Sequence, residues 1–266
     1  MSIYTELTEE FNDGKLRAVI SSGQAVVLHK LAIMSKDGDW ILRNDQESLE
    51  HVLSVLSRRN ARYRFGAPLD LRWLEGGWSS HFEFSTGVLR VRTDFVTCPP
   101  RMTPEAVREL WNRESAGSVP VVGVRDLCEL KKTNRQRDYA VIGELARLLD
   151  NPRDELLFSR SARDLIRLAS EYPDLVKELS QKRPVLRKAR NDIDALEKAL
   201  DNEQRRLMHA NEDRLRIFMT SAAKWKREWP GIEDAIASLP LREAHSLIVR
   251  EAEKLLPFRP QEVIQS

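Results

Sequence analysis

The chain contains few cysteines, almost no net charge and no long hydrophobic run. Its two cysteines, Cys98 and Cys128, lack the close spacing of zinc ligands, and two cysteines do not suggest a disulfide framework. No apolar stretch approaches the roughly 20 residues of a membrane-spanning helix. Lys and Arg number 43 and Asp and Glu 41, so the formal net charge of +2 excludes a large uniform field for nonspecific nucleic-acid binding.

What the chain does contain is a globular composition with a heavily charged surface. Hydrophobic residues make up 41% and charged residues 32% of the 266 residues, a length that suggests one or two domains. Residues 1–6 are polar and acidic and do not resemble a secretory signal. We therefore expect a cytoplasmic protein with no membrane partner.

The first half of the chain alternates between helical and extended patterns, with turn signals around Gly66 and Gly76. Short mixed elements of this kind predict an α+β domain, in which helices flank a mixed sheet. The expected helices cover residues 3–12, 24–33 and 47–59, and the expected strands cover 17–20, 40–43 and several segments between 62 and 96, including 69–74.

From about Asn151 onward the strand patterns disappear, and prolines such as Pro230, Pro240 and Pro257 mark breaks between helices. The sequence therefore predicts a first domain over residues 1–150 and an all-helical bundle over residues 151–266. The expected helices of this second half cover residues 161–171, 185–207, 214–229, 231–239 and 242–256.

Two carboxylates stand two residues apart at Asp37 and Asp39. Side chains at i and i+2 of an extended segment point to the same side, with Cα atoms about 6.6 Å apart. Both can then reach a pair of divalent ions, which lie about 3.5–4 Å apart in two-metal sites. The small-residue turn at Ser22 and Gly23, before a helix, offers backbone N–H groups to phosphates. The alternatives are a solvated Asp-x-Asp turn and an ordinary helix N-terminus.

A third carboxylate, Asp94, ends a segment with strand character. In residues 88–96, Val88, Arg90, Arg92 and Asp94 share one face, and Leu89, Val91, Thr93 and Phe95 share the other. One polar and one apolar face are typical of a strand that lines a site in a half-covered sheet. The alternatives are a surface strand that ends in Asp94, or Glu83 as the third carboxylate.

This order of motifs resembles the polymerase-beta-like nucleotidyltransferase superfamily, whose signature is a Gly-Gly or Gly-Ser pair, a helix and then Asp-x-Asp. Ser22-Gly23 stands at the glycine pair, and Asp37-Gly38-Asp39 at the acidic motif. The resemblance covers residues 17–149 and implies that Asp37, Asp39 and Asp94 are catalytic and bind metal. It also implies toxin–antitoxin or phage-defence pairs, in which such proteins often occur.

A second motif resembles minimal members of the same superfamily. After the catalytic strands these proteins often carry a strand, a Leu-x-x-Leu-Lys helix and an Arg-x-x-Asp that opens the next helix. Residues 127–131 and 135–138 match this arrangement. Lys131 is then a partner for triphosphate oxygens, as is Lys36 beside Asp37. The alternatives are that Lys131 is a solvated helix-end cation and that Asp138 only caps a helix.

The chain departs from the family pattern at Ser22, at Gly38 and at residues 33–35, where Ile33-Met34-Ser35 replaces the Arg-x-Thr often seen before the aspartates. Ser22 replaces the first glycine of the pair, which narrows the conformational range of the backbone. Gly38 replaces an apolar strand residue between the two aspartates, where a glycine can mark a bulge that would spoil the i, i+2 geometry. These departures also fit an enzyme that has lost its activity.

The resemblance implies the Mg²⁺- or Mn²⁺-dependent transfer of a nucleoside monophosphate from an NTP, ATP among them, to an acceptor hydroxyl. The acceptor is a small molecule, an RNA end or a protein side chain, and the sequence leaves all three open. The basic run from Lys182 to Arg190 suggests RNA contact, against the alternative of a solvated helix face. The second hypothesis is a decayed fold that binds a nucleotide or a protein partner.

Overall fold

The computed structural model describes residues 2–112, 119–189 and 192–260 and divides into two compact units. Unit 1 comprises Met1–Val122 and Arg216–Ser266, and unit 2 comprises Gly123–Leu215. These units have other boundaries than the two domains expected from the sequence, residues 1–150 and 151–266. The expected domain boundaries stay a prediction. In the described part of the chain, no helix is long and apolar enough to cross a membrane.

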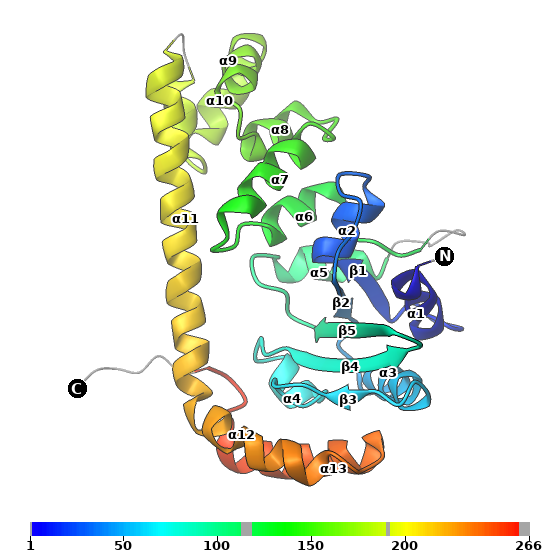
Figure 1. The fold of residues 1–266 in the computed structure, drawn as a ribbon. Coiled ribbons are helices and arrows are strands. Elements are labelled where there is room, and N and C mark those ends of the chain that lie inside the picture. Colours follow the sequence, from blue (N-terminus) through cyan, green and yellow to red (C-terminus); the bar gives the residue numbers. More distant parts are fainter. Residues whose placement is uncertain (1, 113–118, 190–191, 261–266) are drawn as a thin grey trace, which may run out of the picture. The chain divides into compact units, whose positions relative to one another are not determined.

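Unit 1 is built on one mixed five-stranded sheet of order β1-β2-β5-β4-β3 (Figure 1). Only β2 and β5 run parallel, and the other neighbours are antiparallel. The sheet, its flanking helices and the helical C-terminal region make this an α+β protein, as the sequence predicts. The strands are β1 (Ala18–Ser21), β2 (Asp37–Leu42), β3 (Arg62–Tyr63), β4 (Ser80–Thr86) and β5 (Leu89–Val96).

One face of the sheet is apolar and is covered by α1 (Ile3–Phe11) and α3 (Gln46–Arg58). Trp40 of β2 stacks on Phe95 of β5 with ring centroids 5.5 Å apart, and Phe11 packs edge-on against both rings. The indole of Trp40 donates a hydrogen bond of 2.8 Å to the hydroxyl of Thr8. Because side chains alternate along a strand, this burial turns every second residue of β2 and β5 to the opposite, polar face.

Gly38 lies on the apolar face, directly before Asp39. β2 pairs with β5 in continuous register from Asp37 to Ile41. The strand therefore has no bulge at Gly38. A Cβ atom on Gly38 would lie 2.4 Å from the ring of Trp40 and 2.6 Å from the ring of Tyr4. The glycine is therefore required because two aromatic rings occupy the space of its side chain.

Two elements of unit 1 differ from the sequence prediction. Helix α2 (Ser22–Leu28) ends five residues before the expected residue 33, because His29 caps it and Lys30 takes a left-handed φ of 63°. Residues 69–74 do not form a strand: Asp70 accepts a hydrogen bond from the backbone N–H of Arg72 and so starts α4 (Leu71–Leu74).

The C-terminal helices α12 (Ala223–Ile236) and α13 (Leu241–Leu255) also belong to unit 1. Tryptophan indoles fix them to the sheet region. Trp225 donates to the carbonyl of Gly66, Trp73 to that of Leu256, and Trp78 to that of Pro257, at 2.9, 3.0 and 3.0 Å. The expected break at Pro230 is absent, since this proline lies inside α12.

Unit 2 is helical throughout its described residues. Its buried core contains Leu156, Leu165, Leu186, Leu196 and Leu200. The expected long helix over residues 185–207 is wrong: Pro184 begins a short 3-10 turn, η1, and a separate helix begins at Ile193. The helices not yet given are α5 (Pro104–Leu110) in unit 1, then α6 (Val124–Leu130), α7 (Gln136–Ala146), α8 (Pro152–Phe158), α9 (Ala162–Glu171), α10 (Pro173–Leu179), η1 (Pro184–Lys188) and α11 (Ile193–Ser221), which continues into unit 1.

Replacing Gly38 with alanine is expected to destabilise the protein by about 1–3 kcal/mol, because the new methyl group overlaps the rings of Trp40 and Tyr4. Chemical denaturation measures the change in the free energy of unfolding. Gly231→Ala is the matched control, since a Cβ at this helical position meets nothing within 4 Å and should stabilise by roughly 0.5–1 kcal/mol. Equal effects of the two substitutions would contradict this account.

His245 of α13 makes the stability of unit 1 dependent on pH. Burial lowers the pKa of His245, and nearby Asp70 and Glu50 offset part of this effect. Its Nδ1 lies 2.7 Å from the hydroxyl of Tyr63, which also accepts a hydrogen bond from the N–H of Leu69, and a neutral His245 with Nδ1 unprotonated accepts a hydrogen bond from this hydroxyl. A protonated His245 cannot accept that hydrogen bond.

We expect the free energy of unfolding to decrease as the pH falls below about 6.5, since the unfolded state then binds the proton more readily. Denaturation curves between pH 7.5 and pH 5 measure this decrease. His245→Gln should flatten the curve, and His209→Gln, at an exposed position of α11, should leave it unchanged. An unchanged slope in His245→Gln would show that other groups cause the dependence.

Candidate functional site

A row of polar residues crosses the polar face of the unit 1 sheet. Ser21 at the end of β1 pairs with Asp39 of β2, Asp39 pairs with Asp94 of β5, and Asp94 pairs with His81 of β4. Neighbouring strands lie about 4.8 Å apart, so the backbones that carry the Asp39 and Asp94 carboxylates are direct neighbours. The fold thus brings together two carboxylates that are 55 positions apart in the sequence.

A second row runs beside the first, two residues along each strand. Asp37 of β2 pairs with Arg92 of β5, and Arg92 pairs with Glu83 of β4. Their charges alternate across the sheet, and a guanidinium nitrogen of Arg92 lies 3.9 Å from a carboxylate oxygen of Asp37. Glu83 instead pairs with Arg90 at 2.6 Å, which makes it a salt-bridge partner within the sheet. Asp37 and Asp39 therefore lie on one face, as the i, i+2 spacing predicts.

The turn at Ser22 and Gly23 follows β1 directly and so begins beside Asp39. Ser22 has a φ of 51°, in the left-handed region that favours glycine. A Cβ atom on Gly23 would lie 2.3 Å from the hydroxyl oxygen of Ser35. The side chain of Ser21 makes no capping hydrogen bond, and the first N–H groups of a helix have no acceptor within the helix.

Gln24 joins this turn to the acidic segment. Its side-chain amide donates to the carbonyl of Ser35 at 3.0 Å and to that of Asp37 at 3.4 Å. On the other side of the segment, the hydroxyl of Tyr4 donates to the carbonyl of Lys36 at 2.6 Å. These contacts fix the backbone of residues 35–37 between α1 and α2.

The environment of the carboxylates is mixed in charge. One oxygen of Asp94 lies 2.7 Å from Nδ1 of His81 and 3.4 Å from a guanidinium nitrogen of Arg64. One oxygen of Asp37 is buried and has no hydrogen-bond partner in the described part of the chain. The pKa of the Tyr4 hydroxyl is raised, first by burial and then by the negative charges of Asp37, Asp39 and Asp94. Tyr4 thus lies within the electrostatic influence of all three carboxylates.

These residues suit a divalent cation in donor type, because Mg²⁺ prefers carboxylate oxygens and is commonly bound by one or two of them. The buried oxygen of Asp37, which lies 3.9 Å from the guanidinium of Arg92, has no hydrogen-bond partner in the described part of the chain. In the arrangement described, however, no three His, Cys, Asp or Glu side chains of the described residues lie close enough to hold an ion together. His81 and Arg64 both contact the same oxygen, Oδ1, of the Asp94 carboxylate.

The predicted lysines lie in different units. Lys36 is exposed, next to Asp37. Lys131 belongs to unit 2, where it caps α6 and its ammonium lies 3.9 Å from a carboxylate oxygen of the buried Asp138. Asp138 also accepts a hydrogen bond of 2.6 Å from the hydroxyl of Thr133. The helix positions of the second motif are as predicted, and the contact of either lysine with a nucleotide stays a prediction.

Sequence reasoning does not assign four residues near the carboxylates to the site: Arg64, His81 and Arg92 on the polar face, and Tyr4 of α1. Arg92 shares the polar face of the 88–96 segment with Asp94, and His81 alternates with Phe82, so both had a period-two signal. The signal did not show which strands are neighbours. No local sequence pattern indicates Tyr4, because its hydroxyl contacts the acidic segment through a hydrogen bond to Lys36, 32 residues later in the sequence.

No protein-family model matches the chain, and no curated protein is significantly similar to it in sequence. Among solved structures, two chains from Helicobacter pylori are similar at 12% identity. One is a "putative nucleotidyltransferase", with a TM-score of 0.38, 79% of this chain covered and 96% of that chain. The other is JHP933, with a TM-score of 0.39, 80% of this chain covered and 92% of that chain. TM-scores of this size do not establish a shared fold.

Ser22→Gly is expected to stabilise the protein by up to about 1 kcal/mol. Relief of the left-handed conformation yields roughly 1–2 kcal/mol, and the greater freedom of glycine in the unfolded chain offsets part of it. Thermal or chemical denaturation measures the difference. Ser22→Ala serves as the control, because alanine keeps the strained φ and loses only the hydroxyl. A glycine variant no more stable than the alanine variant would rule out strain at this turn.

Proposed function

We propose that the polar face of the unit 1 sheet is a metal-dependent nucleotidyl-transfer site. In this proposal Asp37, Asp39 and Asp94 bind Mg²⁺ or Mn²⁺, and an NTP is the substrate. The turn at Ser22 and Gly23 contacts the phosphates, and an acceptor hydroxyl receives the nucleoside monophosphate. The resemblance of the sequence motifs to polymerase-beta-like nucleotidyltransferases supports this assignment.

The observation that carries the proposal is the direct register pairing of Asp39 with Asp94. Like charges at directly opposed positions of a sheet destabilise it, so a fold gains nothing from this pair on its own. Departures of this kind from stabilising patterns are expected at functional sites. A divalent cation would convert the repulsion into shared coordination, with Asp37 on the same face as the third carboxylate.

Each group of the site has a distinct proposed role. A bound Mg²⁺ would neutralise charge that develops on the phosphates. The backbone N–H groups at Ser22 and Gly23 would donate hydrogen bonds to phosphate oxygens, because they lie at the end of β1 next to Asp39. Asp94 would accept the proton of the acceptor hydroxyl, with His81 holding its carboxylate in place.

The runner-up is a decayed nucleotidyltransferase fold that binds a nucleotide or a protein partner without catalysis. Its specific support is the set of basic side chains at the carboxylates: Arg92 lies at Asp37, and Arg64 lies at Asp94 beside the imidazole of His81. Protein cations in these places can compensate the acidic charge without a metal ion. The alternative therefore predicts nucleotide binding or partner binding that survives chelation.

The test is label transfer from each of the four labelled NTPs to a mixture of cell RNA and protein, with Mg²⁺ or Mn²⁺. Asp39→Asn keeps the shape of the side chain and removes its charge. We expect it to lower the transfer rate at least about 100-fold, the scale of losing one electrostatic contact to a transition state. Glu9→Gln removes one exposed carboxylate from α1 and should leave the rate unchanged.

A second measurement separates the two candidates. Nucleotide with Mg²⁺ should raise the melting temperature of the wild type, since a ligand that binds only the folded state stabilises it. Stabilisation without transfer, in the wild type as in Asp39→Asn, would favour the binding protein. Neither transfer nor stabilisation by any NTP would reject a nucleotide site on this face. Far-UV circular dichroism of each variant confirms that it is folded.

A further inference from the structure

Unit 2 contains a cavity that the proposed nucleotidyl-transfer site does not use. Its volume is about 450 Å³, within the range of small-molecule sites. Cationic side chains dominate its lining, which comes from α6, α7, α8, η1, α11 and the segments between them. These cations are Arg125, Lys132, Arg160, Lys182, Arg183 and Arg206.

The anions of the lining do not balance this charge. Glu129 and Glu203 are its only carboxylates among the described residues. Lys132 pairs with Glu129 at 2.9 Å, and both Arg160 and Arg183 pair with Glu203 at 2.6 and 2.9 Å. Glu203 thus serves two guanidinium groups at once, and one positive charge of this trio is left uncompensated.

The trio is buried, which makes its excess charge significant. The side chain of Arg183 is 6% exposed, and those of Arg160 and Glu203 are 12% and 14% exposed. Arg183 also donates to the carbonyls of Leu156 and Ser159, so its position is fixed. Burial lowers the pKa of Arg160, which expresses the cost of keeping its charge away from water. Buried charge in excess is unfavourable unless an anion compensates it.

Two further cations at the cavity form no close ion pair among the described residues, although Glu178 lies within electrostatic reach of Lys182. Among the described residues, neither Lys182 nor Arg206 has an ion-pair partner within 4 Å, and both side chains are exposed. Arg125 differs from them, because it pairs with Asp154 at 3.1 Å. The cavity therefore has two groups of positive charge: the buried Arg160–Glu203–Arg183 trio, whose net charge is positive, and the exposed side chains of Lys182 and Arg206.

We propose that this cavity binds a small phosphate-bearing anion, whose phosphate is held by Lys182 and Arg206 above the Arg160–Glu203–Arg183 trio. A phosphate group supplies the two negative charges and the multiple acceptor oxygens that such a set of donors matches. Apolar lining residues, Ile142, Leu157 and Leu207, leave room beside the cations for the body of the ligand. The site would be separate from the carboxylates of unit 1.

Pyrophosphate is the probe, titrated calorimetrically into the full chain in EDTA at constant ionic strength. Chelation removes divalent cations, and without them Asp37, Asp39 and Asp94 repel a polyanion. We expect one pyrophosphate per chain. The double variant Lys182→Ala/Arg206→Ala should weaken binding at least about tenfold, because two charge-assisted contacts are lost. Its exposed side chains make no internal contact on which folding depends.

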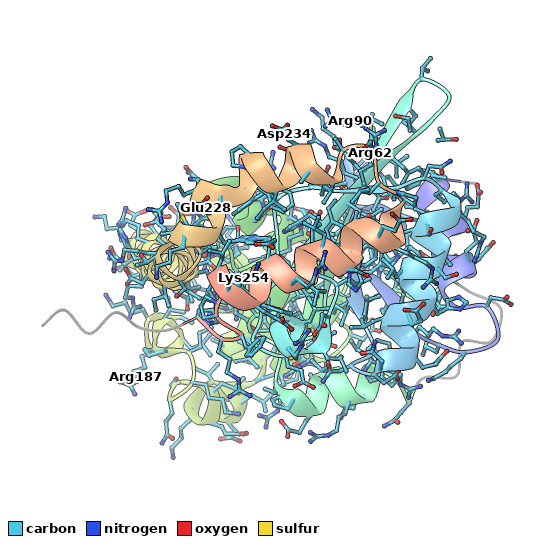
Figure 2. All side chains as sticks on the ribbon, turned by 90° about the horizontal axis from the view of Figure 1, so that it is seen from below. Arg62, Arg90, Arg187, Glu228, Asp234 and Lys254 are labelled. Carbon is cyan, nitrogen blue, oxygen red and sulfur yellow. The ribbon has the colours of Figure 1, made fainter. Side chains whose placement is uncertain are left out.

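The matched control is Arg187→Ala/Arg205→Ala. It removes the same charge from the same two segments, but neither residue lines the cavity, and Arg187 extends away from its segment into solvent (Figure 2). This control should bind pyrophosphate like the wild type. Equal weakening in both double variants would mean nonspecific attraction by a basic surface, as RNA contact would require, and would overturn the proposal. No binding to the wild type at millimolar pyrophosphate would also overturn it.

Discussion

Backbone pairing forces two carboxylates into adjacent places, and much of unit 1 is arranged around that constraint. Asp39 and Asp94 cannot move apart, because their strands share one continuous register and a slip of one residue would turn their side chains to the other face. The register is fixed by the residues that follow them: Trp40 pairs with Phe95 and stacks on it. Apolar packing on one face thus holds like charges together on the other.

The polar face compensates this repulsion in two ways. Two guanidinium groups flank the pair, Arg64 on the Asp94 side and Arg92 beside Asp37, and the imidazole of His81 also contacts Asp94. Close backbone contacts hold the acidic segment from outside the sheet, through Gln24 of α2 and Tyr4 of α1. Both kinds of contact leave one buried oxygen of Asp37 without a hydrogen bond among the described residues, 3.9 Å from the guanidinium of Arg92. The site is therefore preorganised on rigid elements while part of its charge is left unmatched, as binding sites require.

Local patterns in the sequence place the carboxylates on extended segments. They do not explain why Gly38 stands between Asp37 and Asp39 or where α2 ends. The alternation in residues 88–96 gave the face of Asp94, and the spacing of Asp37 and Asp39 gave their common side. The meaning of Gly38 could not be read locally, because the rings that exclude its side chain come from two residues along the strand and from α1. The early end of α2 depended on the backbone at Lys30. The basic side chains at Asp94 depended on strand order, which a single sequence does not encode in a readable form.

The interrupted path of the chain through unit 1 has a consequence for how the protein emerges from the ribosome. Residues 123–215 are synthesised between the two parts of this unit, so all five strands are made before the segments that contact Trp73 and Trp78. Until Leu256 and Pro257 arrive, both indole N–H groups lack their carbonyl acceptors. Unit 2, whose residues are contiguous in the sequence, can fold before α12 and α13 of unit 1 have been synthesised. The acidic face does not depend on this step, because all the residues that form it precede unit 2 in the sequence.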